Sequence, residues 1–263
     1  MSESRLSVAW EALDAGRRTA LIPYLTAGYP SAQESLDALR AADEFADIIE
    51  VGVPFSDPLA DGPTIQRSTF EALQAGMTLT GTLELIARAQ LSHPVVIFSY
   101  FNPVLRYGVE RFLREADALR IGGLLLTDLP AGSDPAVESA VQASPLDLIR
   151  LVAPTTRPER LAAAVAGAEG FVYLVARLGV TGATASLSRG LAESVAQLRQ
   201  ATSLPVAVGF GISTPVQAAE VGRLADGVVV GSALVDVLGH DGVAGMRRFL
   251  ASLRQALDRG AAA

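Results

Sequence analysis

The sequence predicts a single (β/α)₈ TIM barrel with an extra N-terminal helix. Eight short apolar runs alternate with longer helix-like segments along the 263 residues. Most runs are continuously apolar rather than alternating, which is typical of strands that are buried on both faces. The number of runs and the chain length both match a closed barrel. A doubly wound open sheet remains the alternative, because alternation alone does not show closure.

The elements follow in a regular order after an amphipathic helix predicted over Ser4–Gly16. Each predicted strand is short and bounded by Gly, Pro or Asp, and the eight are Ala20–Thr26, Ile48–Val53, Val95–Tyr100, Gly122–Thr127, Asp147–Val152, Phe171–Val175, Val206–Gly209 and Gly227–Gly231. The helical patterns between them include Ser31–Ala42, Arg157–Ala166, Arg189–Gln200 and Thr214–Gly222. The last of these has proline in its first turn, which is a helix-start signal.

No linker, low-complexity tract or sharp change of composition divides the chain. We therefore expect one domain over residues 1–263, with a frayed Ala-rich tail over 259–263. No apolar run is long enough to span a bilayer, and no signal-like segment opens the chain. A cytoplasmic location is the expectation.

Composition excludes several function classes. The net charge of -7 argues against nucleic acid and against an anionic membrane surface as partners. All 21 basic residues are arginine, so Schiff-base chemistry on a lysine is impossible. Cysteine is absent, and the only histidines are His93 and His240, both expected at the surface. No metal site is predicted, because a three-histidine site cannot be built.

A carboxylate stands inside the second predicted strand. Glu50 lies in the apolar run Ile48–Val53, and Asp57 and Asp61 follow on a loop stiffened by Pro and Gly. An unpaired charge in a buried strand is costly, so chemistry explains Glu50 better than packing does. A structural carboxylate is the alternative for Glu50, and turn or cap roles are the alternative for the two aspartates.

Other polar groups are predicted at the same end of the barrel. Asp128 ends the fourth strand and is interpreted as structural, and Tyr173 lies on the sixth strand. Glycine-rich turns follow the last two strands, with Gly211 in the first and Gly231 and Ser232 in the second. Such turns expose backbone N–H groups, and barrels of this kind bind phosphate there. The sequence therefore predicts a phosphate site opposite the carboxylates.

The segment from Glu50 to Gln66, EVGVPFSDPLADGPTIQ, resembles the signature of the tryptophan synthase alpha chain family. Further matches run in order from the first strand to the last: Pro23–Pro30, Tyr100–Pro103, Asp128–Pro130, Tyr173, Gly179–Gly182, Gly209–Ile212 and Gly231–Ala233. The resemblance therefore covers almost the whole chain.

The resemblance implies a lyase that cleaves indole-3-glycerol phosphate, by a retro-aldol reaction, to indole and glyceraldehyde 3-phosphate. It implies that Glu50 transfers protons and that Asp61 binds the indole N–H. Acid–base work by carboxyl groups suits a chain without lysine or cysteine. No cofactor is implied in this chain, because pyridoxal phosphate belongs to the beta chain of the complex.

The resemblance also assigns the binding residues. Backbone and hydroxyl groups of Gly182, Gly211, Gly231 and Ser232 would hold the phosphate, and the segment Arg177–Ser188, with Arg177 and Thr181, would act as a lid. The indole pocket would be formed by Tyr173, Ile22, Tyr100, Thr127, Leu151 and Phe210. Two departures from the family pattern are Ala176, where serine is frequent, and Ile22, where an aromatic residue is common.

The implied partner is a tryptophan synthase beta chain in an alpha2beta2 complex, which Asp57, Asn102 and Pro103 would face. Three alternatives remain open. One is a stand-alone indole-producing lyase without a beta chain. The others are a sugar-phosphate isomerase on the same barrel and a non-catalytic subunit of a synthase complex.

Overall fold

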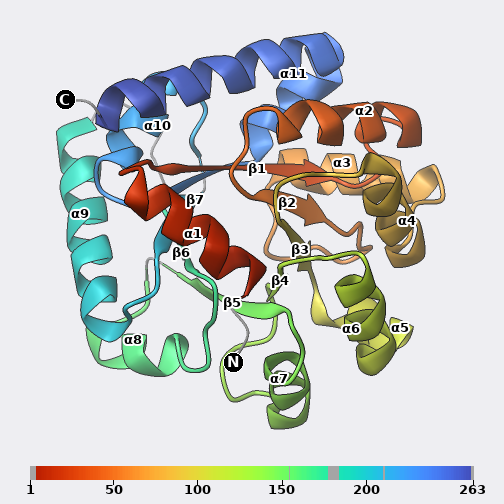
Figure 1. The fold of residues 1–263 in the computed structure, drawn as a ribbon, viewed down its shortest axis with the longest axis horizontal. Coiled ribbons are helices and arrows are strands. Elements are labelled where there is room, and N and C mark those ends of the chain that lie inside the picture. The colour runs from red at the N-terminus through yellow and green to blue at the C-terminus, as the bar shows by residue number, and fades with distance from the viewer. Residues whose placement is uncertain (1–3, 154, 177–183, 210, 262–263) are drawn as a thin grey trace.

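Eight parallel strands close into a barrel in the computed structural model, which describes residues 4–153, 155–176, 184–209 and 211–261. Neighbouring strands pair in sequence order, and β8 pairs with β1 to complete the ring. Closure excludes the open sheet that alternation alone left possible. The confirmed fold is a TIM barrel with one helix before the first strand (Figure 1).

All eight predicted strands are confirmed, and three of them have the predicted bounds. The strands are β1 (Ala20–Thr26), β2 (Ile49–Gly52), β3 (Val95–Ser99), β4 (Gly123–Leu126), β5 (Asp147–Val152), β6 (Val172–Val175), β7 (Val206–Gly209) and β8 (Gly227–Val230). The remaining five differ by a residue or two at their ends, where hydrogen-bonded pairing stops before the apolar run does.

Helices surround the barrel (Figure 1). They are α1 (Arg5–Ala15), α2 (Ala32–Asp43), α3 (Pro63–Gln74), α4 (Leu79–Ala89), α5 (Phe101–Tyr107), α6 (Val109–Ala118), α7 (Pro135–Gln142), α8 (Pro158–Ala164), α9 (Thr184–Ala201), α10 (Pro215–Gly222) and α11 (Ser232–Ala261). The start predicted at Thr214 is confirmed, because its side chain and that of Gln217 form a reciprocal capping box.

The last helix differs from expectation at its end. Residues up to Ala261 continue α11, so the helix extends into the segment that was expected to fray from residue 259. The helix is interrupted at Gly242, which has a positive φ of 65° that favours glycine.

Two apolar clusters hold the barrel together. The larger lies between the strands and the surrounding helices, and the smaller fills the barrel interior. Leu6, Trp10 and Leu13 of α1 belong to the interior cluster. In Figure 1, α1 lies across the centre of the barrel, and these three side chains close its N-terminal end. The opposite end of the barrel is thereby left as the open one.

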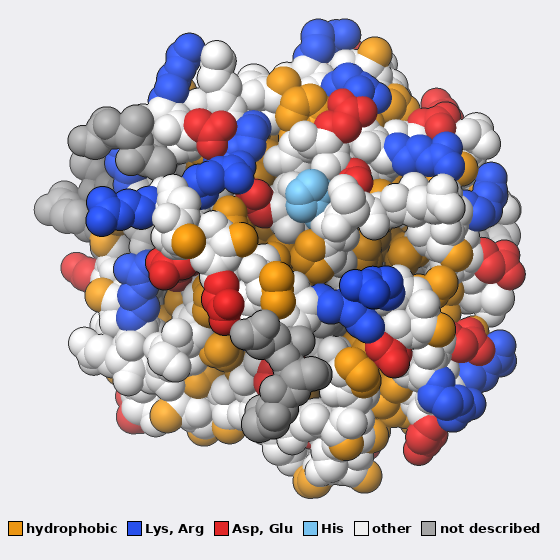
Figure 2. Space-filling view, in the orientation of Figure 1, with side chains coloured by type: hydrophobic (Ala, Val, Ile, Leu, Met, Phe, Trp, Pro, Cys, Tyr) orange, Lys and Arg blue, Asp and Glu red, His pale blue; other side chains and the backbone are white. Residues whose placement is uncertain are grey.

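The face that carries α1 has mixed charge. Figure 2 shows arginine and acidic side chains interspersed on this face, without a large area of one sign. None of the helices in the described part of the chain combines the length and apolar character that a membrane span requires.

The closure by α1 yields a stability prediction. Trp10 is 6% exposed, packs against Phe171 at 5.7 Å between ring centroids, and makes no hydrogen bond through its indole N–H. We expect Trp10→Ala to lower the free energy of unfolding by about 3–5 kcal/mol, because the lost contacts leave a cavity in the interior. Urea denaturation followed by circular dichroism measures the loss.

Val8→Ala is the matched control, because Val8 lies on the same helix and is 51% exposed. Its effect should stay within about 0.5 kcal/mol. If both variants lose the same free energy of unfolding, Trp10 does not contribute to the closure of the barrel by α1.

Candidate active site

A cavity of about 270 Å³ opens at the C-terminal ends of the strands. This end of a (β/α)₈ barrel is where active sites are found. The described residues that line the cavity come from both ends of the sequence and are Tyr24, Glu50, Asp61, Gly62, Ile65, Phe98, Tyr173, Gly211, Ile212, Ser213, Val229, Gly231, Ser232, Ala233 and Asp236. Barrel closure thus brings together the predicted carboxylates and the predicted phosphate turns.

Glu50 is fully buried and has no hydrogen-bond partner. It lies on β2, in register with Tyr24 of β1 and Val96 of β3. Neither carboxyl oxygen has a hydrogen-bond partner among the described residues, and the side chain has no exposed surface. Burial disfavours the charged form and raises the pKa of Glu50 to about 8. The carboxyl group therefore holds its proton at neutral pH and can donate it to a ligand in the cavity.

Asp61 reaches the same cavity from the loop after β2. The Tyr100 hydroxyl fixes this loop by accepting a hydrogen bond of 2.8 Å from the backbone N–H of Ala60. Burial raises the pKa of Asp61 to about 6, although its hydrogen bond with Tyr100 acts in the opposite direction. Asp61 is therefore largely ionised at pH 7 and can accept a hydrogen bond from a ligand.

Aromatic rings form walls beside the carboxyl groups. Tyr24 and Phe98 meet edge to face at 5.3 Å, and Tyr173 lies on the far side of the barrel on β6. A Cβ atom at Gly52 would collide with the Tyr24 hydroxyl, and one at Gly209 would collide with the Tyr173 hydroxyl. Glycine at these two strand ends therefore makes room for the tyrosines. The resulting pocket has aromatic walls beside its carboxyl groups.

The structure corrects the prediction for Ile22. This residue is fully buried in the interior cluster and does not line the cavity, whereas Tyr24 does. Side chains two apart in a strand point the same way, so both face inward, but Tyr24 is nearer the open end. The aromatic residue that β1 contributes to the cavity is therefore Tyr24.

The other predicted pocket residues lie around the cavity but are not among those that line it. Tyr100 is buried and acts through its hydroxyl on the loop of Asp61. Thr127 and Leu151 are half-buried at the ends of β4 and β5. Their contact with a ligand stays a prediction. Phe98, Ile65 and Val229 line the cavity and were missed, because an apolar residue in an apolar strand carries no distinguishing signal.

The predicted phosphate turns meet at one side of the cavity. Gly211 has a φ of 85°, and Gly231 and Ser232 stand at the start of α11. The first N–H groups of a helix are free to bind an anion. Arg177, Thr181, Gly182 and Phe210, which were predicted as lid, phosphate and pocket residues, lie outside the described residues.

The predicted partner residues stand on the rim of the same end. Asp57 and Asn102 are exposed and Pro103 is half-buried. Phe55 stacks against Tyr100 at 5.1 Å, which joins the loop of Asp57 to the start of α5. Asp128 accepts a hydrogen bond of 2.6 Å from the backbone N–H of Phe101, so its expected structural role is that of a cap on α5.

Within the described ranges, no group of three or more His, Asp or Glu side chains is arranged to hold a metal ion. The two histidines lie at the surface, as expected. His93 bonds to Asp43 at 3.0 Å, and His240 is exposed on α11.

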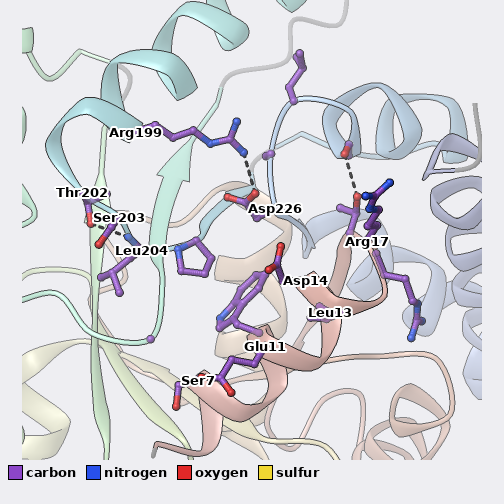
Figure 3. A pocket seen from close by; sticks show the side chains of 18 of the residues that line it. Ser7, Glu11, Leu13, Asp14, Arg17, Arg199, Thr202, Ser203, Leu204 and Asp226 are labelled. Carbon is purple, nitrogen blue, oxygen red and sulfur yellow. Dashed lines mark hydrogen bonds and ion pairs between the residues drawn. The ribbon is translucent and has the colours of Figure 1, made fainter.

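A larger hollow of about 920 Å³ lies at the opposite end of the barrel, beside α1. Figure 3 shows Ser7, Glu11 and Asp14 of α1 facing Arg199, Thr202 and Leu204 across it. Arg199 is paired with Asp226 at 2.8 Å, and the hollow is wide open to solvent. It has no buried carboxyl group comparable to Glu50 among its described lining residues, so the smaller cavity is the better candidate site.

Comparisons with known proteins find relatives over almost the whole chain. The family model described as "Tryptophan synthase alpha chain" matches residues 10–259. A tryptophan synthase alpha chain from Gloeobacter violaceus is 47% identical over 241 residues, which cover 90% of this chain and 87% of the relative. Tryptophan synthase from Mycobacterium tuberculosis has a chain with a TM-score of 0.89, 41% identity and coverage of 97% and 99% of the two chains. The alpha subunit from Legionella pneumophila has a TM-score of 0.86, 34% identity and coverage of 98% and 100%.

The unpaired burial of Glu50 predicts a pH-dependent stability. Between pH 4.5, the ordinary pKa, and about 8, the folded chain keeps a proton that the unfolded chain has released. The stability of the native protein should therefore fall as pH rises through this interval. Glu50→Gln removes this loss, so the variant should gain about 2–4 kcal/mol over the native protein between pH 5 and pH 8. Urea denaturation at several pH values measures the difference.

Glu84→Gln, on the exposed side of α4, is the matched control for replacing a glutamate by glutamine at the surface. If the stability difference between Glu50→Gln and the native protein does not change with pH, the carboxyl group of Glu50 is charged in the folded protein.

Proposed function

The chain belongs to the tryptophan synthase alpha chain family, and from that premise we propose how its residues perform the family's reaction. Members cleave indole-3-glycerol phosphate in tryptophan biosynthesis, and this chain is a lyase of that kind. The family uses no cofactor in this subunit, and pyridoxal phosphate belongs to the beta chain. The observation that carries the residue assignment is the buried, unpartnered carboxyl group of Glu50 in the cavity.

Glu50 acts first as an acid and then as a base. Its proton passes to C3 of the indole ring, which makes the ring a leaving group. The bond between C3 and the glycerol carbon then breaks, and its electron pair restores the aromatic indole. The resulting carboxylate takes the proton of the adjacent glycerol hydroxyl as this oxygen forms the aldehyde carbonyl. Glu50 ends protonated, and the products are indole and glyceraldehyde 3-phosphate.

Asp61 stabilises the charge that develops on the ring. Protonation at C3 makes the indole nitrogen electron-poor, and a carboxylate that accepts its N–H hydrogen bond opposes this charge. The raised but still acidic pKa of Asp61, about 6, supports this role, because the group is largely ionised while Glu50 is protonated. The tether from Tyr100 to the loop supports it too, because it limits the loop's movement.

The phosphate would lie at the turns of Gly211, Gly231 and Ser232, with Gly182 as a further donor. The start of α11 supports this assignment, since its free N–H groups favour an anion. The indole would lie against Tyr24, Phe98 and Tyr173, with Tyr100, Thr127, Leu151 and Phe210 nearby. Arg177 and Thr181 are proposed for a lid, on the sequence resemblance alone.

Membership of the family implies a beta-chain partner. We propose an alpha2beta2 complex in which the beta chain covers the rim with Asp57, Asn102 and Pro103. Leu59, Phe70 and Leu105 support this surface, because they are large apolar side chains that are 93%, 62% and 52% exposed near the same rim. An apolar area of this kind is typical of an interaction site.

Two alternatives remain testable. A stand-alone lyase would release indole at full rate without a beta chain, and a non-catalytic subunit would release none with one. The aromatic walls formed by Tyr24, Phe98 and Tyr173 suit an indole ring better than a sugar phosphate, so the described lining does not favour a sugar-phosphate isomerase.

Glu50→Gln tests the mechanism. We expect indole release to fall by about 10²–10⁴-fold, because the amide cannot transfer the proton. Binding of a non-cleavable indole-alkyl phosphate should change little, because the two side chains have nearly the same shape. The measurements are indole release with a saturating beta chain and calorimetric titration of the analogue. Turnover near the native rate would refute the role of Glu50.

Leu105→Asp tests the docking surface. A charge buried against the beta chain costs free energy, so the beta-chain concentration that gives half-maximal stimulation of indole release should rise about 10-fold or more. Basal activity without beta chain should stay unchanged. Val8→Asp is the control, since Val8 is equally exposed, at 51%, but lies on α1 at the other end of the barrel. If this beta-chain concentration rises equally in both variants, or does not rise in Leu105→Asp, the interface lies elsewhere.

A further inference from the structure

Three carboxylates line a cavity that has to accept a phosphate ester. They are Glu50, Asp61 and Asp236, and no arginine is among the described residues that line it. A phosphate monoester carries between one and two negative charges near neutral pH. Backbone N–H groups bind it without supplying a net positive charge. Each carboxylate therefore opposes substrate binding unless its charge is reduced.

Glu50 and Asp236 differ in how their charge is reduced. Burial raises the pKa of Glu50 to about 8, so its carboxyl group is protonated at neutral pH, whereas Asp61, with a pKa of about 6, stays largely ionised and is proposed to accept the indole N–H. Asp236 is on α11, four residues after Ser232, and positions four apart lie on the same face of a helix. Asp236 therefore lies about one helical turn, or 5–6 Å, along the axis of α11 from the proposed phosphate turn.

Both oxygens of Asp236 are engaged by α3. Oδ1 accepts a hydrogen bond of 2.6 Å from Nη2 of Arg67, and Oδ2 accepts one of 3.0 Å from the hydroxyl of Thr64. Arg67 and Thr64 lie on the first two turns of the helix that begins directly after Asp61 and Gly62. Asp236 is thus turned toward α3 and is paired with a cation that stands outside the cavity lining.

We propose that Arg67 is a positioning residue for the phosphate end of the substrate: it neutralises Asp236 and keeps that carboxylate away from the phosphate. The inference rests on the proposed phosphate position at Gly231 and Ser232. It assigns a role in substrate affinity to an ion pair on the surface between α3 and α11. An isolated surface pair of this kind contributes little to stability, so a stability role does not account for it.

The test uses glycerol 3-phosphate as the probe, with its dissociation constant measured by calorimetry on the full-length chain. Arg67→Gln should weaken binding about 5–10-fold, because Asp236 is left charged beside the anion. The loss should shrink at high salt, which screens exposed charges. Asp236→Asn should bind the probe at least as tightly as the native chain. The double variant, Arg67→Gln with Asp236→Asn, should recover most of the affinity.

Arg199→Gln is the matched control. Arg199 and Asp226 form an ion pair at 2.8 Å with side-chain exposures of 49% and 39%, close to the 48% and 40% of Arg67 and Asp236. This pair lies at the opposite end of the barrel (Figure 3), so its loss should leave the dissociation constant unchanged.

Kinetics separate a charge effect from a general structural one. For indole-3-glycerol phosphate, Arg67→Gln should raise KM by the same 5–10-fold with kcat within about two-fold, because the acid–base groups are untouched. An unchanged dissociation constant in Arg67→Gln would overturn the inference. So would a double variant that binds no better than Arg67→Gln, since that would indicate lost packing.

Ser232→Ala distinguishes this failure from a failure of the proposed function. This variant should weaken the binding of glycerol 3-phosphate, because the hydroxyl donor is lost. If Ser232→Ala has no effect, the phosphate lies elsewhere and both proposals fall. If it weakens binding while Arg67→Gln does not, the phosphate position stands and only the role of Arg67 is refuted.

Discussion

The burial of Glu50 without a partner is the constraint on which the rest of the site depends. A carboxyl group in this position loses its hydration and receives no hydrogen bond in return, which costs free energy. The cost is tolerated because β2 is paired on both sides and the interior below is packed with apolar side chains up to α1. The same rigidity prevents the carboxyl group from moving toward water. The fold therefore keeps an acid in its protonated form, as proton donation to carbon requires.

The second carboxylate, that of Asp61, is held in place by a hydrogen bond to its loop rather than by a strand. Asp61 is on a loop, and a loop positions a side chain less firmly than a strand does. The Tyr100 hydroxyl compensates by bonding to the backbone N–H of Ala60. Tyr100 also stacks on Phe55 and precedes α5, whose first free N–H is capped by Asp128. The geometry of the acid pair thus depends on the end of β3, and a partner bound at this rim would act on the same contacts.

Most of the fold and the acid pair could be predicted from the sequence, because their signals are local. Continuous apolar runs mark the strands, and a glutamate inside such a run stands out against them. The prediction for Ile22 was wrong because residues 22 and 24 lie on the same face of β1. Only the closed barrel shows which of the two is near enough to the open end to line the cavity. The pair of Arg67 and Asp236 spans 169 positions in the chain, and each residue alone reads as an ordinary surface charge. Such a contact has no sequence signal.

The charges of the cavity are best understood together. A ligand with an apolar ring at one end and a phosphate at the other needs an acid near the ring and no free negative charge near the phosphate. Burial serves the first need, because it keeps Glu50 protonated. No cation is then required beside the ring, where it would attract the phosphate to the wrong end of the cavity. Ion pairing serves the second, because Arg67 and Thr64 occupy both oxygens of Asp236 near the surface. Glu50 and Asp236 are therefore neutralised in different ways. An arginine inside the cavity would solve the second problem but would also favour the ionised form of Glu50 and so abolish the acid.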